Sequence, residues 1–151
     1  MVICDDIRSL YNVGSVFRTA DAVGVDKIYL CGITGRPGRD KVDEKLSKVA
    51  LGAEKAVPWE YRKQSWRLVD ELKAQGFEIV SLELTPKSLN YTGYKPKFPL
   101  ALIIGNEVAG VKKSLLSRSD RCVEIPMRGM KESLNVAVAF GIVASWIGEC
   151  K

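Results

Sequence analysis

Two hydrophobic patterns alternate along the chain. Short, continuously apolar runs predict strands that are buried on both faces, as in a parallel sheet. Between them, apolar residues recur at helical spacing, which predicts amphipathic helices. Such an alternation predicts an α/β fold with a mainly parallel sheet flanked by helices. The predicted strands are residues 2–4, 27–31, 56–59, 77–84, 100–104 and 121–125, and the predicted helices are residues 13–23, 42–51, 62–75, 112–119 and 135–149.

Individual residues refine these boundaries. Asn12 can cap the first helix, and Gly24 follows its last apolar residue. Pro58 cannot donate a hydrogen bond to a neighbouring strand, so the third predicted strand, residues 56–59, is predicted at an edge. The run 100–104 is apolar throughout and is predicted to be a central strand. Residues 85–99 are rich in proline, lysine and tyrosine, and we expect a linker there.

Three loops lie where an open α/β sheet binds its ligands, beyond the carboxyl ends of the strands. They are residues 5–12, 105–110 and 126–135. In the second loop, Glu107 stands between two glycines. Its carboxylate could accept hydrogen bonds and hold the loop together, or it could simply fix a turn.

The third loop is the most informative of the three. Pro126 fixes its own backbone angle, whereas Gly129 permits backbone shapes that other residues avoid. Ser133 and Asn135 are good helix caps and precede a long apolar helix. We expect a loop buried at the end of the sheet that holds a small ligand through main-chain atoms. The alternative is an ordinary connection between a strand and a helix.

The composition narrows the chemistry. A chain of 151 residues suits one domain with a real core, and no apolar run is long enough to cross a membrane. There is no histidine, which excludes Ser-His-Asp and Cys-His catalysis and histidine metal sites. The four cysteines are scattered without a C-x-x-C pair, so we expect reduced cytosolic thiols, no disulfide and no metal.

The charge balance permits a phosphate-bearing partner. The net charge is +5 and the isoelectric point is about 9.0. The loop after the second strand carries Arg36, Arg39 and Lys41, which could meet phosphates or could simply be solvated. Neither a G-x-G-x-x-G turn after the first strand nor a G-x-x-x-x-G-K-[ST] loop occurs, so a dinucleotide or P-loop site is not supported.

Taken together, three segments resemble a known family. Residues 12–22 read NVGSVFRTADA, residues 103–111 read IIGNEVAGV, and the third segment reads IPMRG at 125–129 and SLNVAVA at 133–139. They resemble, in order and spacing, the three motifs of the SpoU (TrmH-like) RNA ribose 2′-O-methyltransferases of the SPOUT superfamily. The resemblance covers essentially the whole chain.

The resemblance implies a fold and a function that hydrophobic periodicity does not. It implies an α/β sheet whose C-terminal part forms a trefoil knot, a pocket for S-adenosyl-L-methionine in that knot, and a homodimer in which Val138, Ile142, Ala144 and Trp146 of the last helix contribute to the interface. It also implies a cytoplasmic enzyme that methylates a ribose 2′-hydroxyl of structured RNA, with tRNA favoured over rRNA. We expect residues 1–151 to form a single domain, without the separate N-terminal RNA-binding domain of some relatives.

The resemblance also assigns roles to residues. Arg18 resembles the catalytic arginine and Asn12 its companion in the first motif, while Ser133 and Asn135 would hold the active-site geometry. Glu107 would order the second-motif loop at the cofactor site. The residues that would line that site are Leu82, Gly105, Ile125, Met127 and Leu134.

Two questions stay open at this point. Arg18 could accept the proton of the ribose hydroxyl, or it could stay charged and stabilise the developing alkoxide; the second is favoured because a guanidinium normally stays protonated. A non-catalytic, knotted RNA-binding protein is the alternative function. The residues that we expect to contact RNA are Arg36, Arg39, Lys41, Lys112, Lys113, Arg128 and Lys131.

Overall fold

The computed structural model describes residues 1–38 and 41–151, and the side chains of all of these except residues 41–43. Strands and helices alternate along most of the chain, as the hydrophobic pattern predicts. The elements are β1 (Val2–Asp5), α1 (Leu10–Ala22), β2 (Ile28–Cys31), α2 (Lys41–Ala50), α3 (Ala53–Ala56), β3 (Trp59–Arg62), α4 (Ser65–Ala74), β4 (Glu78–Leu82), β5 (Leu89–Asn90), the 3₁₀ turn η1 (Tyr91–Gly93), β6 (Leu100–Ile104), α5 (Lys113–Leu116), β7 (Arg121–Glu124) and α6 (Val136–Glu149).

The strands form one sheet in the order β3-β2-β1-β6-β4-β7-β5, and every paired neighbour is parallel. The predicted α/β fold with a mainly parallel sheet is therefore confirmed. β6 lies in the middle of the sheet, as its uninterrupted apolar sequence predicts, and all five of its residues are buried. The strand order does not establish the trefoil knot, which stays a prediction.

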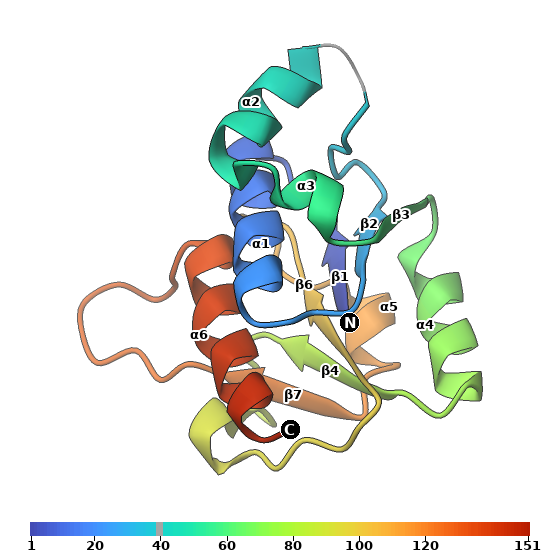
Figure 1. Cartoon of the computed structure of the whole chain (residues 1–151). Helices are drawn as coiled ribbons and strands as arrows, with labels where there is room; N and C mark the ends of the chain where they lie inside the picture. Colours follow the sequence, from blue (N-terminus) through green and yellow to red (C-terminus); the bar gives the residue numbers. More distant parts are fainter. Residues whose placement is uncertain (39–40) are drawn as a thin grey trace.

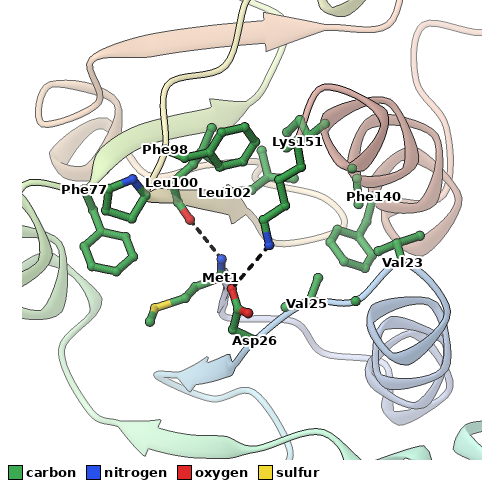
Figure 2. Close-up of a pocket in the computed structure, with 15 residues that line it drawn as sticks. Met1, Val23, Val25, Asp26, Phe77, Phe98, Leu100, Leu102, Phe140 and Lys151 are labelled. Atoms are coloured by element: carbon green, nitrogen blue, oxygen red, sulfur yellow. Dashed lines mark hydrogen bonds and ion pairs between the residues drawn. The ribbon is translucent and has the colours of Figure 1, made fainter.

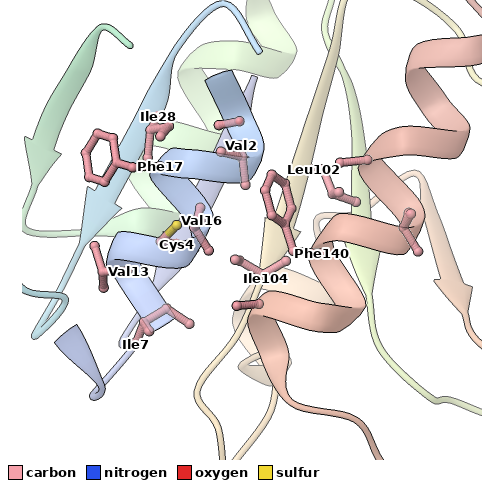
Figure 3. Packing of buried hydrophobic residues seen from close by; sticks show 14 of the residues in the cluster. Val2, Cys4, Ile7, Val13, Val16, Phe17, Ile28, Leu102, Ile104 and Phe140 are labelled. Atoms are coloured by element: carbon pink, nitrogen blue, oxygen red, sulfur yellow. The ribbon is translucent and has the colours of Figure 1, made fainter. Parts of the chain in front are cut away.

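Helices cover both faces of the sheet (Figure 1). α1, α2, α3 and α6 pack on one face, where Phe17 and Phe140 are among the largest fully buried side chains. Figure 3 shows these two rings with Val2, Ile28 and Leu102, which lie on strands β1, β2 and β6 beneath α1 and α6. α4 and α5 pack on the opposite face and bury a separate apolar cluster. None of the helices in the described residues is long and apolar enough to cross a membrane.

The predicted start of the first helix is wrong. The helix begins at Leu10, and Ser9 is its N-cap, with the Ser9 Oγ accepting a hydrogen bond of 3.3 Å from the Asn12 N–H. Serine is as good a cap as asparagine, and three more residues join the helix when the cap lies earlier. Asn12 therefore sits inside the first turn, where its side-chain amide is available for other partners. The predicted end is confirmed, because Gly24 follows the helix with a positive φ of 68°.

Two other predicted segments need correction. The run around Pro58 is split between α3 and β3, which begins at Trp59; β3 does lie at the edge of the sheet, as predicted. Pro58 instead precedes the strand and accepts a hydrogen bond from Ile28 through its carbonyl. The predicted linker 85–99 contains a short strand, β5, which pairs with β7 at the other edge. Such a two-residue strand leaves no recognisable periodic signal in the sequence.

Two helical glycines differ in the space around them, and this difference yields a prediction. A Cβ at Gly14 would lie 2.5 Å from the Leu46 carbonyl oxygen, because α1 and α2 approach each other closely there. A Cβ at Gly141 in α6 would meet only the Thr19 methyl group, at 3.6 Å. We expect Gly14→Ala to lower the free energy of unfolding by about 1–3 kcal/mol through overpacking.

The matched variant Gly141→Ala should leave that free energy unchanged or raise it by up to about 1 kcal/mol, because alanine favours a helix over glycine. Urea unfolding followed by circular dichroism measures both variants. Equal effects of the two substitutions would show that the α1–α2 contact does not require glycine.

Candidate functional site at the carboxyl edge of the sheet

A cavity of about 950 Å³ opens at the carboxyl ends of β4, β6 and β7. Its volume is within the range of small-molecule sites. The second and third predicted loops form much of its wall, which agrees with the expected place of a ligand in an open α/β sheet. The lining includes all six residues predicted for the cofactor site, namely Leu82, Gly105, Glu107, Ile125, Met127 and Leu134, together with Ser133 and Asn135.

A second cavity, of about 450 Å³, lies at the opposite, amino ends of β1, β4 and β6 (Figure 2). Its wall is mainly apolar and includes Phe77, Phe98 and Phe140. Lys151 and Asp26 form an ion pair of 3.8 Å beside it. None of the three predicted loops contributes to this cavity, so we assign the functional site to the cavity at the carboxyl edge.

A chain of side-chain hydrogen bonds joins the three loops. The Asn135 Nδ2 donates to the Asn12 Oδ1 at 3.0 Å, and the Asn12 Nδ2 donates to the Glu107 Oε1 at 3.0 Å. These residues come from the third, first and second loops respectively. Asn135 and Glu107 line the cavity, whereas Asn12 lies behind them on α1. The sequence predicted these residues for one site, and the structure brings them together.

Glu107 binds the start of helix α1. Its Oε2 accepts from the Arg8 N–H and its Oε1 from the Ser9 N–H, both at 2.9 Å. Burial raises the pKa of Glu107, but the hydrogen bonds from Arg8, Ser9 and Asn12 outweigh burial, and the pKa lies below its ordinary value. The carboxylate is therefore ionised at neutral pH, at the end of the helix that favours a negative charge. We expected Glu107 to order its own loop, and its contacts also extend to the start of α1.

The second loop is closed tightly by its own residues. The Asn106 side chain accepts from the Val108 and Ala109 N–H groups, both at 2.9 Å, and donates to the Asp6 carbonyl at 2.8 Å. A Cβ at Gly105 would lie 2.4 Å from the carbonyl carbon of Gly110, so the loop can close only around glycine. Sequence reasoning named Gly105 but missed Asn106, whose place between a glycine and an acid was the available signal.

The third loop differs in part from its prediction. Most of its residues are exposed, including Ser133 and Asn135, so it borders the cavity instead of being buried. Asn135 is the N-cap of α6, as expected, and its Oδ1 accepts from the Ala137 and Val138 N–H groups. These two N–H groups are consequently not available to a ligand. Ser133 makes no hydrogen bond within the described residues and faces the cavity as an uncommitted hydroxyl.

An ion-pair cluster holds the end of β1 against the residue that follows the second loop. The Lys112 Nζ lies 2.6 Å from the Asp6 Oδ2 and 3.2 Å from the Asp5 Oδ2. Asp5 is 1% exposed. Its Oδ2 accepts no hydrogen bond, so this contact is ionic, whereas its Oδ1 accepts from Lys112 at 3.3 Å. The Lys112 charge is thus balanced inside the protein, and contact with RNA stays a prediction for this residue.

Arg18, the predicted catalytic arginine, lies outside the cavity lining, as Asn12 does. It is exposed on α1 and makes no hydrogen bond or ion pair with other described residues. The other basic residues predicted to contact RNA are spread over several loops. Arg36 lies over the Tyr61 ring, Lys113 begins α5, and Arg128 and Lys131 are exposed in the third loop. Arg39 lies outside the described residues, as does the side chain of Lys41.

The sequence model of the SpoU rRNA Methylase family matches residues 1–145, and the match includes all three loops. The chain belongs to this family. This membership confirms the resemblance predicted from the three motifs.

Named relatives of the SpoU chain modify different RNAs. A tRNA (guanosine(18)-2′-O)-methyltransferase of Aquifex aeolicus is 34% identical over 143 residues, which are 95% of this chain and 65% of the relative. A 23S rRNA (guanosine(2553)-2′-O)-methyltransferase of Bacillus subtilis is 35% identical over 143 residues, which are 95% of this chain and 55% of that protein. The chain therefore spans between about half and two thirds of the length of these curated relatives.

Solved structures agree with the SpoU fold. The TrmH/SpoU tRNA modifying enzyme of Aquifex aeolicus superposes with a TM-score of 0.88 at 31% identity, over 99% of this chain and 74% of that one. An AdoMet-bound rRNA methyltransferase of Sinorhizobium meliloti gives a TM-score of 0.88 at 29% identity, over 98% of this chain and 55% of that one. Within the described residues of the present chain, no group of three or more cysteine, aspartate or glutamate side chains could hold a metal ion.

The Glu107 contacts predict the effect of neutralising this carboxylate. Glutamine has one acceptor oxygen, so Glu107→Gln must turn an amide NH₂ toward either the Arg8 N–H or the Ser9 N–H. We expect the free energy of unfolding at pH 7 to fall by about 1–2 kcal/mol, a value reduced by partial exposure to solvent. Glu132→Gln, in the same cavity wall but without a hydrogen bond to described residues, is the control and should change it little.

Urea unfolding between pH 7 and pH 3 measures this effect. Because the Glu107 pKa is lowered in the folded state, its stabilisation is present above the unfolded pKa and is lost as the pH falls through the folded pKa. The difference between wild type and Glu107→Gln should therefore shrink with acidification. A difference that does not change with pH would show that the ionised Glu107 carboxylate does not stabilise the start of α1.

The Lys112 cluster gives a second pH-dependent prediction. Lys112→Met would leave the buried Asp5 without a counter-charge, and we expect a loss of about 1–3 kcal/mol in the free energy of unfolding at pH 7. This value is reduced because the Lys112 side chain is 47% exposed. Lys113→Met, one residue later and exposed, is the control.

The sign of the pH dependence follows from two shifts. Burial raises the pKa of Asp6, but the hydrogen bonds from Lys112 and Ile33 outweigh burial, so the Asp6 pKa is lowered overall. Burial lowers the pKa of Lys112, but the contacts with Asp6 and Asp5 outweigh burial, so the Lys112 pKa is raised overall. The pair therefore stabilises between roughly pH 4 and pH 10 and is lost beyond each folded pKa. An equal loss for Lys112→Met at pH 7 and pH 2 in urea unfolding would rule out this ion pair as the cause.

Proposed function

We propose that the chain is an S-adenosylmethionine-dependent RNA methyltransferase that methylates a ribose 2′-hydroxyl. The observation that carries this proposal is the hydrogen-bonded chain Asn135–Asn12–Glu107 beside the cavity. It unites residues of all three motifs, and named relatives of the family methylate the 2′-oxygen of guanosine in tRNA or 23S rRNA. A non-catalytic RNA-binding protein would not need this arrangement beside a small-molecule cavity.

The cavity residues fit S-adenosylmethionine. Leu82, Ile125 and Leu134 offer an apolar surface for the adenine ring, and Gly105 lets the second loop close tightly in the cavity wall. Several carboxylates in the wall suit a ligand that carries a sulfonium and an ammonium group. They are Glu83, Glu107, Glu124 and Glu132. An rRNA methyltransferase with this fold has been solved with the same cofactor bound.

When bound, S-adenosylmethionine supplies an electrophilic methyl group. The chain must hold the ribose oxygen in line with that group and stabilise the charge that develops on the oxygen. Arg18 can do this as a cation, because its guanidinium is not committed to any described carboxylate. The Ser133 hydroxyl, also uncommitted, can orient the substrate from the cavity wall. The hydrogen bond between Asn12 and Asn135 ties α1, which carries Arg18, to the start of α6, which Ser133 precedes.

We also propose two partners for the chain, a second copy of itself and an RNA. We propose a homodimer in which α6 contributes to the interface, because Val138 is 52% exposed and the buried Trp146 Nε1 has no hydrogen-bond partner among the described residues. Ala144, which we expected at the interface, is buried in the core of its own chain at 7% exposure. Structured RNA, either tRNA or rRNA, is the proposed substrate. We further propose a cytoplasmic location, a trefoil knot and a single domain over residues 1–151.

Methyl transfer from labelled S-adenosylmethionine to total tRNA and to rRNA tests the function. We expect alkali-stable label in one class of RNA. Arg18→Ala should lower the rate by about 10²-fold or more, because an electrostatic group at the developing oxyanion contributes that much. Cofactor affinity should be unchanged, since Arg18 lies outside the cavity wall.

Two further variants sharpen the test. Arg18→Lys with full activity would show that a simple positive charge suffices, whereas loss of activity would show that the guanidinium shape is needed. Lys95→Ala, which removes an exposed cation outside all three motifs, is the control. A wild-type protein that does not bind S-adenosylmethionine would refute the enzyme and favour the RNA-binding protein.

A further inference from the structure

Arg36 lies over an aromatic ring. Its guanidinium carbon lies 4.0 Å from the centre of the Tyr61 ring. Tyr61 is itself fixed, because it is half-buried against the core and its hydroxyl donates to the Gly32 carbonyl at 2.9 Å. Arg36 makes no ion pair with another described residue, so its charge is not neutralised. Arg36 is also partly exposed, so a guanidinium supported by Tyr61 can meet a planar group of a ligand.

The loop that carries Arg36 is fixed to the same strand ends as the functional site. The Thr34 Oγ1 donates to the Cys4 carbonyl and accepts from the Ile7 N–H, both at 3.0 Å, and Thr34 is buried. The Asp6 Oδ1 accepts from the Ile33 N–H at 2.9 Å. Asp6 also bonds to Asn106 of the second loop through its carbonyl. The first residues of the loop, just ahead of Arg36, are thus fixed before binding, which lowers the entropic cost of binding.

The sheet order places Arg36 to one side of the cavity. β6 forms part of the cavity wall, and β1 and β2 follow it in the sheet. Neighbouring strands lie about 4.8 Å apart, so the loop after β2 begins about 10 Å from the end of β6. Successive nucleotides in a stacked strand rise about 3.4 Å, so this distance corresponds to about three nucleotides.

Cations without acidic partners flank Arg36 along this edge. Arg8 follows β1 and Lys63 follows β3, and the side chains of both are exposed and form no ion pair with described residues. The neighbouring Arg62, by contrast, is paired with Glu60 and Glu71. The uncompensated charges therefore lie in the order Arg8, Arg36, Lys63 along the strand ends. This arrangement suits a phosphodiester backbone that runs along the edge of the sheet.

We propose that Arg36, supported by Tyr61, is a stacking platform for an unpaired base of the RNA substrate, within about three nucleotides of the methylated ribose. Arg8 and Lys63 contact the phosphates on either side of it. This proposal rests on the proposed function and adds to it the strand ends along which the RNA lies. Unpaired bases are commonly recognised by stacking on aromatic rings and guanidinium planes, and sequence-specific RNA recognition mostly targets such bases.

The test compares the affinity of four variants for the RNA that the wild type methylates, in filter-binding titrations at several salt concentrations. Arg36→Ala should weaken binding about tenfold, because it removes both a stacking plane and a charge. Arg36→Lys keeps the charge, so it should keep the salt dependence but still weaken binding about fivefold. Tyr61→Leu should resemble Arg36→Lys, and Tyr61→Phe, which keeps the ring, should bind within about twofold of wild type.

Arg67→Ala is the matched control. Arg67 also lies near an aromatic ring, with its guanidinium carbon 5.2 Å from the centre of the Trp66 ring, but it belongs to α4 instead of the loops at the strand ends. Its loss should leave RNA affinity nearly unchanged. S-adenosylmethionine affinity, measured by calorimetry, should be the same in every variant, because neither Arg36 nor Tyr61 lines the cavity.

The outcomes separate this proposal from the proposed function. Wild-type methyl transfer together with wild-type affinity in Arg36→Ala would overturn the platform alone. Arg36→Lys that binds as tightly as wild type would also overturn it, because a point charge would then suffice. A wild-type protein that binds neither tRNA nor rRNA would overturn both. Loss of affinity in Arg36→Ala, Arg36→Lys and Tyr61→Leu, but not in Tyr61→Phe or Arg67→Ala, supports the platform.

Discussion

The hydrogen bonds from Asn135 to Asn12 and from Asn12 to Glu107 constrain three loops that lie far apart in the sequence. Asn12 and Asn135 are separated by 123 positions, and Asn12 and Glu107 by 95. Two of the three side chains also bind the start of a helix: Asn135 caps α6, and Glu107 binds the N–H groups ahead of α1. The site is therefore held by groups that the two helices already require, and its geometry is coupled to the starts of both.

The sheet makes this convergence possible. Because all paired strands are parallel, the loops after β1, β6 and β7 emerge at one edge, and β1 and β6 are direct neighbours. The close approach at Gly105 and Gly110 keeps the second loop compact, so that Glu107 can reach across to α1. The Lys112 ion pairs with Asp5 and Asp6 hold the end of that loop against β1. Apolar packing beneath the edge then leaves few ways for the loops to move separately.

Much of this arrangement could be predicted from the sequence, for reasons that differ between elements. The apolar run of β6 identified the central strand because only a strand covered on both faces can lack polar residues. The site residues were predicted from the three motifs together, and the cavity contains all six residues assigned to it. The N-cap was misplaced because Ser9 and Asn12 have similar capping preferences, and only the Glu107 contact requires the earlier start. β5 was missed because a strand of two residues has no period, and the stacking of Arg36 on Tyr61 joins residues that no local pattern connects.

The cap of α6 has a consequence for how the site responds to assembly. The Asn135 Oδ1 accepts from the first turn of α6, while the Asn135 Nδ2 donates to Asn12 at the site. A displacement of α6 would therefore pull on Asn12 and, through it, on Glu107. The same helix presents Val138 one turn after its cap, and this side chain is half exposed although the helix is apolar almost throughout. An apolar helix with an exposed face is best stabilised by a partner surface. A partner chain that covers this face would consequently fix the orientation of the residue that links the third motif to the first, and so would order the site without contributing a side chain to it.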